Sequence, residues 1–211
     1  MTQSLFKNVV TSEETLRELI GTPSERAVRK QLSSLDQHCR TFISSSPFLL
    51  VGTVNSAGMQ DVSPRGDAPG FVLVMDEKTL IIPERPGNRR LDTLRNILQT
   101  SAIGLIFLIP GVEETLRVNG RACLVRDTDL LERLTVQGKQ PLIAIGVEVE
   151  ECFLHCAKAF KRSKLWDTTT WPERKSLPSL GQMLCDQLQL QNTTVRELDE
   201  TLDKDYKRTL Y

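Results

Sequence analysis

A short basic segment holds the residues best suited to chemistry: Pro83-Glu84-Arg85-Pro86-Gly87-Asn88-Arg89-Arg90-Leu91-Asp92-Thr93. An apolar stretch ends there, a Pro/Gly turn follows, and the pattern predicts a helix from near Asn88 with Arg89 and Arg90 in its first turn. Cations oppose the positive end of a helix dipole unless an anion lies above it. Guanidinium groups bind phosphate through paired hydrogen bonds. The segment therefore predicts a phosphate-monoester site, and solvated surface arginines are the alternative.

A second segment precedes it by about twenty residues and is rich in proline and glycine: Val62-Ser63-Pro64-Arg65-Gly66-Asp67-Ala68-Pro69-Gly70-Phe71. These residues interrupt a strand and allow the backbone to approach something flat or bulky. An ion pair between Arg65 and Asp67 on the surface is the alternative interpretation.

Several familiar sites are absent from the sequence. It contains no G-x-x-x-x-G-K-[ST], no G-x-G-x-x-G and no G-x-S-x-G, which excludes the usual phosphate loop, dinucleotide turn and nucleophile elbow. The 27 basic residues balance 27 acidic ones, with a pI near 6.7. A neutral chain does not favour sequence-independent binding of nucleic acid.

The cysteines predict a reduced, cytoplasmic protein. The chain has five cysteines, and its first residues lack the basic region and apolar stretch of a signal peptide. The longest apolar run, residues 102–109, is too short to cross a bilayer. Cys152, His155 and Cys156 have the spacing of one helix face. A zinc site would need a fourth ligand that no spacing supplies, so we expect no metal and interpret them as small packing residues.

From residue 48 the sequence predicts short strands joined mostly by hairpins, at residues 48–54, 59–63, 71–75, 80–83, 102–109, 115–125 and 141–149. Closure into a barrel would hide the edges of such an antiparallel sheet. Capping signals and apolar periodicity predict helices at residues 11–21, 22–46, 88–98 and 130–138. The fold class is therefore mainly β with flanking helices (α+β).

The last residues form an amphipathic extension. Leu180 to Leu188 and Leu198 to Tyr206 carry apolar residues at helical spacing, the second run after a capping box at Thr194. We predict an N-terminal helical segment packed on the barrel (residues 1–45), the barrel itself (46–175) and a helical extension at a dimer interface (176–211).

The two chemical segments carry a resemblance to a known family. S-P-R-G-D-x-P-G-F at residues 63–71 and I-P-x-R-P-G-N-x-R-x-D-[ST] at residues 82–93 resemble the pyridoxamine 5′-phosphate oxidase-related split-barrel flavoproteins. A third block at residues 152–166 matches a bacterial branch of FMN-dependent enzymes within that superfamily. The similarity extends from about residue 46 to residue 187.

The resemblance implies a six-stranded split barrel and a homodimer with FMN between its subunits. It implies that Asn88, Arg89 and Arg90 hold the phosphate, that Ser63, Pro64 and Arg65 line the flavin ring, and that Thr115 and Arg117 reach in from the partner subunit. Pro83 and Arg85 complete the expected cofactor-binding residues. Arg162, Lys164 and Trp166 correspond loosely to a substrate region, with a solvated helix face and aromatic packing as alternatives.

The resemblance thus implies an FMN-dependent oxidoreductase that acts on an unidentified small molecule. Pyridoxamine 5′-phosphate is not the expected substrate, because the ending motif of the true oxidase is missing. A flavin-binding or flavin-storing protein without turnover is the alternative, since few titratable groups stand in the motifs. A nucleic-acid or protein-interaction domain on a small barrel is a third class, which the neutral charge does not support.

Overall fold

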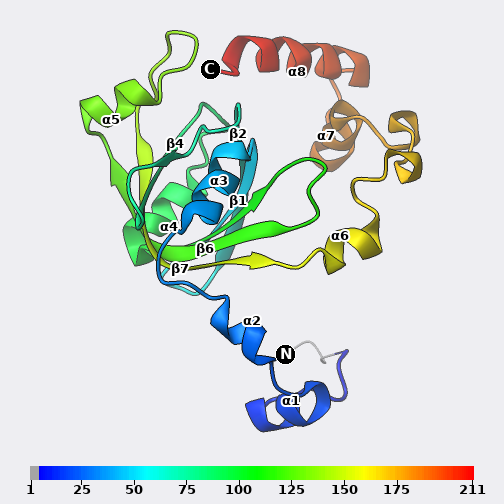
Figure 1. Ribbon diagram of the computed structural model, residues 1–211. Helices are drawn as coiled ribbons and strands as arrows, with labels where there is room; N and C mark the ends of the chain where they lie inside the picture. Colours follow the sequence, from blue (N-terminus) through cyan, green and yellow to red (C-terminus); the bar gives the residue numbers. More distant parts are fainter. Residues whose placement is uncertain (1–4) are drawn as a thin grey trace.

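Seven antiparallel strands curl into one sheet in the computed structural model, which describes residues 5–211 (Figure 1). Along the sheet they follow the order β2-β1-β5-β6-β7-β4-β3. The strands are β1 (Phe48–Val54), β2 (Gln60–Gly66), β3 (Leu73–Val74), β4 (Thr79–Pro83), β5 (Ala102–Leu108), β6 (Thr115–Val125) and β7 (Ala144–His155). The sheet with its flanking helices confirms the predicted fold class. The expectation of six strands is corrected to seven, because the two-residue strand β3 pairs with β4.

Strand β7 corrects the interpretation of the cysteine cluster. Cys152 and His155 lie in this strand, not on a helix, and Cys156 follows it directly. Successive side chains of a strand point to opposite faces, so residues three apart do not share a face. Cys152 is buried against Cys39, with 3.9 Å between the two sulfurs. Within residues 5–211 no group of three or more His, Cys, Asp or Glu side chains is placed to hold a metal.

The main core lies between the sheet and the helices α3 (Gln37–Ser45) and α4 (Asp92–Thr100). Ile43 from α3 and Ile97 from α4 are buried there with strand residues such as Leu49. Each such side chain stabilises the fold by about 1.5–3 kcal/mol. Asn96 of α4 donates to the hydroxyl of Thr53 at 3.0 Å, which fixes the helix on β1. A second small cluster lies under α5 (Thr128–Arg133).

The N-terminal helices differ from the prediction. The single helix expected between residues 22 and 46 is two helices, α2 (Glu25–Arg29) and α3. The chain between them is extended because Leu32 exchanges two backbone hydrogen bonds with Cys152 of β7, at 2.9 and 2.8 Å. Asp36 then caps α3 by accepting from the N–H of Cys39. Helices α1 (Glu13–Ile20) and α2 bury no residue, and residues 1–4 of the predicted segment lie outside the described chain.

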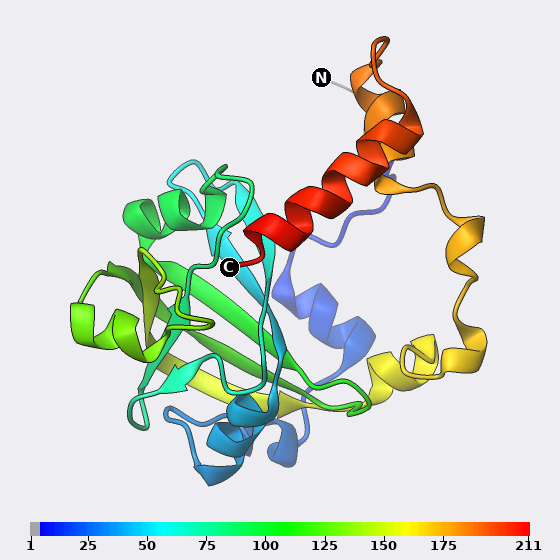
Figure 2. The same ribbon diagram turned by 90° about the horizontal axis from the view of Figure 1, so that it is seen from above.

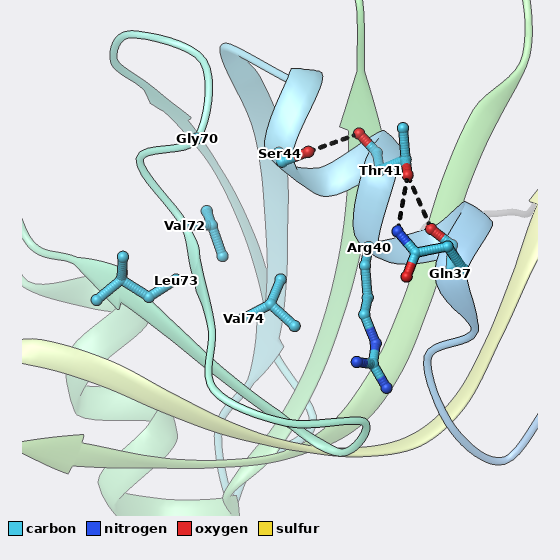
Figure 3. A pocket seen from close by; sticks show the side chains of 8 residues that line it. All are labelled: Gln37, Arg40, Thr41, Ser44, Gly70, Val72, Leu73 and Val74. Carbon is cyan, nitrogen blue, oxygen red and sulfur yellow. Dashed lines mark hydrogen bonds between the residues drawn. The ribbon is translucent and has the colours of Figure 1, made fainter.

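A shallow hollow of about 340 Å³ separates α3 from the segment leading into β3 (Figure 3). Its polar residues have partners in or just before the helix. The hydroxyl of Thr41 donates to the carbonyl of Gln37, and that of Ser44 to the carbonyl of Thr41, each at 2.9 Å. Arg40 Nε donates to the carbonyl of Leu35 at 3.2 Å. None of the predicted site residues lines this hollow. It is therefore a packing groove between two elements and not the candidate site.

Beyond β7 the chain leaves the barrel and returns (Figure 2). It runs outward through α6 (Lys158–Ser163), two 3₁₀ helices (Thr168–Thr170 and Arg174–Ser176) and α7 (Leu180–Leu188), and α8 (Val195–Thr209) leads back. The predicted capping box at Thr194 is present. Helices α7 and α8 pack on each other, and the N–H of Gly181 donates to the carboxylate of Asp199 at 2.8 Å. None of the helices in the described part of the chain is long and apolar enough to cross a membrane.

Candidate functional site

The two ends of the sheet face each other across a split. Strand β2 forms one edge of the sheet. At the other edge, β3 pairs only with Leu80 and Ile81, so the end of β4 is not covered by β3. The residues that follow Pro83 therefore lie opposite the end of β2. Two ion pairs bridge this split. Arg65 Nη1 lies 2.6 Å from Glu84 Oε2, and Arg85 Nε lies 2.8 Å from Asp67 Oδ2. The pairing of Arg65 with Asp67 considered from the sequence is therefore wrong, because the facing segment supplies a closer partner for each.

A cavity of about 1230 Å³ opens beside the split. Its walls come from residues 61–66 with Phe71, from residues 83–94, from residues 139–143 and from residues 209–211. The hydroxyl of Thr93, in the first turn of α4, donates to Asp61 at 3.1 Å and holds that helix beside β2. The cavity is large enough for a cofactor-sized ligand.

The structure brings together the predicted cofactor-binding residues of the first two segments. All of them line this cavity: Ser63, Pro64, Arg65, Pro83, Arg85, Asn88, Arg89 and Arg90. They lie on β2, at the end of β4 and on the loop between β4 and α4. Residues some twenty positions apart in sequence thus meet because β2 and β4 end at the same side of the barrel.

The basic loop is not the start of a helix, which corrects the sequence-based prediction. Helix α4 begins at Asp92, and both Arg89 and Leu91 have left-handed backbones with φ of 60° and 62°. The side chain of Asn88 accepts a hydrogen bond from the N–H of Arg90 at 3.0 Å. Left-handed non-glycine residues cost about 1–3 kcal/mol each and cluster at ligand sites. The loop therefore has the strained geometry that a binding loop shows.

The two arginines of this loop differ in availability. Arg90 Nε lies 2.8 Å from the carboxylate of Asp92, and this hydrogen bond raises the pKa of Arg90 above its ordinary value. Within residues 5–211 no side-chain hydrogen bond or ion pair engages Arg89. A guanidinium without a partner beside a cavity is suited to an anion. Arg89 is thus the better candidate for a phosphate contact.

The pair of Arg65 and Glu84 is incompletely satisfied. Both side chains are largely buried, with exposed fractions of 16% and 19%. Arg65 Nε has no hydrogen-bond partner among the described residues, and Glu84 Oε2 has only its ion-pair contact with Arg65 Nη1. Buried polar groups without partners are rare and costly. The Nε donor of Arg65 is thus left unused, although this atom is itself buried.

Asp67 forms the centre of a better-satisfied group. Its side chain is 1% exposed, and it accepts from Arg85, from the N–H of Ala68 and from the hydroxyl of Tyr211. Burial raises the pKa of Asp67, but the hydrogen bonds from Ala68, Tyr211 and Arg85 outweigh it and hold the pKa below the usual range. No motif or spacing in the sequence points to Tyr211, which lies 144 positions from Asp67.

The other predicted residues lie away from this cavity in the chain that forms it. Thr115 is buried in β6, and the guanidinium of Arg117 lies over the ring of Phe153 at 5.4 Å. Trp166 donates from its indole N–H to the carbonyl of Val112 at 2.8 Å and stacks on a neighbouring aromatic ring. These contacts are those of an aromatic side chain that packs within the protein. The substrate residues predicted alongside it, Arg162 and Lys164, also do not line the cavity.

A comparison with known families identifies the chain's relatives. The sequence profile of the pyridoxamine 5′-phosphate oxidase family matches residues 35–156. This chain belongs to that family. The matched residues run from the loop before α3 to the end of β7 and include both segments that bridge the split. Residues 209–211 of the cavity wall lie outside the family match.

Solved structures with a similar fold come from several bacteria. HupZ of Group A Streptococcus is 22% identical, with a TM-score of 0.47 over 57% of this chain and 93% of that one. A Lactobacillus delbrueckii protein named for pyridoxamine 5′-phosphate oxidase is 20% identical, with a TM-score of 0.47 over 59% of this chain and 98% of that one. An FMN-binding protein of Syntrophomonas wolfei is 10% identical, with a TM-score of 0.44 over 68% and 96%. No curated protein sequence matches this chain.

Proposed function

We propose that this member of the pyridoxamine 5′-phosphate oxidase family binds FMN in the cavity beside the split and uses it as an oxidoreductase on a small molecule. The observation that carries the proposal is the cavity itself. It joins an uncommitted guanidinium on a strained loop, Arg89, to the residues of β2 at Ser63, Pro64 and Arg65. A phosphate monoester would pair with this guanidinium, and a flat ring attached to it would lie along β2.

The cavity favours a mononucleotide. One basic loop lines it, and the sequence contains no dinucleotide-binding turn for a second phosphate and an adenosine. Arg89 and the backbone around Asn88 would hold the phosphate, and Arg65 with its neighbours on β2 would lie along the ring. The flavin, when bound, supplies hydride transfer. The protein supplies position and charge, and Arg65 is suited to stabilise negative charge on a reduced ring.

We further infer that two copies of the chain build the complete site. Arg117 lies outside the cavity of its own chain, and its side chain is 42% exposed, so it is accessible to a partner's cavity, whereas Thr115 is buried. Helix α7 of the extension also carries exposed apolar side chains: Leu180, Met183 and Leu188. Such residues are suited to burial against a second copy. Sedimentation of the flavin-loaded protein is expected to show a dimer, and a monomer that holds FMN tightly would contradict this inference.

A flavin-storing role remains the second candidate, and the composition of the cavity wall supports it. The described lining contains neither histidine nor cysteine, so it offers few groups for proton transfer near pH 7. We still favour catalysis on a substrate other than pyridoxamine 5′-phosphate, since residues 162–166 do not reproduce the ending motif of the true oxidase.

The decisive experiment is spectroscopic. The purified protein, loaded with FMN if necessary, is expected to show a flavin absorption band, and heating is expected to release a compound with the mass of FMN. Anaerobic mixing with NADH, NADPH, pyridoxamine phosphate and small organic acids then tests for bleaching of that band. A protein that ignores added FMN would refute the proposal, and release of FAD would refute its choice of cofactor. Bleaching by pyridoxamine phosphate would overturn the substrate inference, and bleaching by no donor would favour storage.

A further inference from the structure

Tyr211 connects the helical extension to the wall of the cavity. Its hydroxyl donates to Asp67 Oδ1 at 2.8 Å, and its ring lies over the guanidinium of Arg85 at 5.6 Å. Its main-chain oxygen accepts from Lys139 Nζ at 3.0 Å. Asp67 and Arg85 form one of the ion pairs across the split, and Lys139 lines the cavity. Tyr211 therefore rests on the residues that close the barrel.

The rest of the extension is attached to the barrel only loosely. Helices α7 and α8 pack on each other and stand away from the sheet, and the end of α8 comes back to the barrel (Figure 2). In the described part of the chain, every hydrogen bond between residues 180–211 and barrel residues 46–155 involves Tyr211. Release of this one residue would free the end of α8 without disturbing the core.

The docked residue narrows the cavity but does not fill it. Residues 209–211 form one wall, and about 1230 Å³ remains beside them. Undocking also leaves Asp67 satisfied, because Arg85 and the N–H of Ala68 continue to donate to it. Undocking of this wall costs two hydrogen bonds and one cation–π contact, which is few enough for the wall to act as a gate.

We propose that Tyr211 is a binding-site residue that latches the flavin cavity: α8 swings away to admit FMN, and Tyr211 docks on Asp67 and Arg85 behind it. This inference rests on the proposed function and adds a residue outside the family match. The latch governs the rates at which FMN enters and leaves, because Tyr211 completes one wall of the cavity and does not occupy the FMN site itself.

The test measures rates of FMN binding and release by stopped-flow flavin fluorescence. Tyr211→Ala is expected to raise both rates, with release faster by about tenfold to a hundredfold, the loss expected for a hydrogen bond to a charged group. Tyr211→Phe, which keeps the ring over Arg85, is expected to fall between Tyr211→Ala and the wild type. Tyr206→Phe is the matched control, because Tyr206 is the only other tyrosine and is exposed on the same helix.

Three results would overturn the latch. Unchanged release from Tyr211→Ala, in a protein that binds FMN, overturns it while leaving the proposed function intact. Faster entry with unchanged release would show that Tyr211 competes with FMN for its place. A wild-type protein that does not bind FMN overturns the latch together with the proposed function.

A second measurement uses the protein without flavin. The hydrogen bond to Asp67 raises the pKa of the Tyr211 phenol, opposed by the nearby charge of Arg85. In the Tyr206→Phe variant, ultraviolet titration follows Tyr211 alone. We expect a pKa above that of an ordinary tyrosine, and a return towards the ordinary value in Tyr206→Phe/Asp67→Asn. An ordinary pKa in Tyr206→Phe itself would show that the residue is not docked.

Discussion

Replacement of Asp67 by asparagine tests whether the ion pairs across the split hold the barrel closed. The carboxylate is 1% exposed and accepts three hydrogen bonds, while its partner Arg85 is 15% exposed and retains only the carbonyl of Leu134 as a second acceptor. Removal of one charge from a buried pair costs about 3–5 kcal/mol. Asparagine keeps one acceptor oxygen and Arg85 has some access to water, so we expect a loss of about 2–4 kcal/mol.

The assay is urea unfolding, supported by thermal melting. For a chain of this size, 1 kcal/mol shifts Tm by about 2–4 °C, so the melting temperature is expected to fall by about 4–16 °C. Glu200→Gln is the control, because Arg196 Nε and Glu200 Oε1 are 2.9 Å apart but both side chains are exposed. That change is expected to cost no more than about 0.5 kcal/mol. Equal losses for Asp67→Asn and Glu200→Gln would refute the reasoning.

The ion pair of Asp67 and Arg85 also predicts how the stability of the fold changes with pH. The pKa of Asp67 is lower in the folded protein than the usual value, so its charged form stabilises the fold. That contribution is present above the unfolded pKa of about 4 and is lost as the pH falls through the folded value. The difference in stability between wild type and Asp67→Asn is therefore expected to be full at pH 6 and to shrink below about pH 4. A difference that stayed constant down to pH 2 would contradict this assignment.

Three further predictions concern binding, stability and catalysis. Arg89→Ala is expected to weaken FMN binding by about 1.5–3 kcal/mol and Arg90→Ala by less, with little effect on riboflavin; titration calorimetry checks this, and the opposite order would assign the phosphate to Arg90. Gly120→Ala is expected to unfold at lower urea, because its Cβ would clash with the backbone carbonyl of Glu148 at the bulge of β6 and β7; unchanged stability would mean that the bulge relaxes freely. Arg162→Ala is expected to raise KM without changing FMN content once a reductant is known, and loss of FMN instead would place Arg162 at the cofactor.

Much of the barrel could be predicted from the sequence, because its hairpins are encoded locally. The strands β1, β5 and β6 follow apolar runs bounded by turn residues, and the structure confirms them within one or two residues. The failures occur where local signals are ambiguous. Cys152, His155 and Cys156 fit a helix face as a spacing, but Cys152 pairs with Leu32 and Val118 in the sheet. Pairing with these residues is a tertiary contact, and the spacing of residues along the chain does not reveal tertiary contacts.

The candidate site, too, could be predicted from the sequence only in part. The two motif segments are continuous in sequence, so their residues could be assigned to one cavity from a resemblance alone. The pairing across the split could not, since it depends on β3 being too short to cover the end of β4. The helix predicted at Asn88 failed because its side chain forms a turn with Arg90, an interaction that competes with helix formation.

The structure also links the stability of the barrel to its binding site. Glu84 and Arg85 are consecutive, and each pairs with a charged residue at the other end of the sheet. Three of these four charged residues, Arg65, Glu84 and Arg85, line the cavity. A ligand that contacted the cavity wall on both sides of the split would stabilise the closure as it bound. The two ion pairs therefore link binding in the cavity to the stability of the fold.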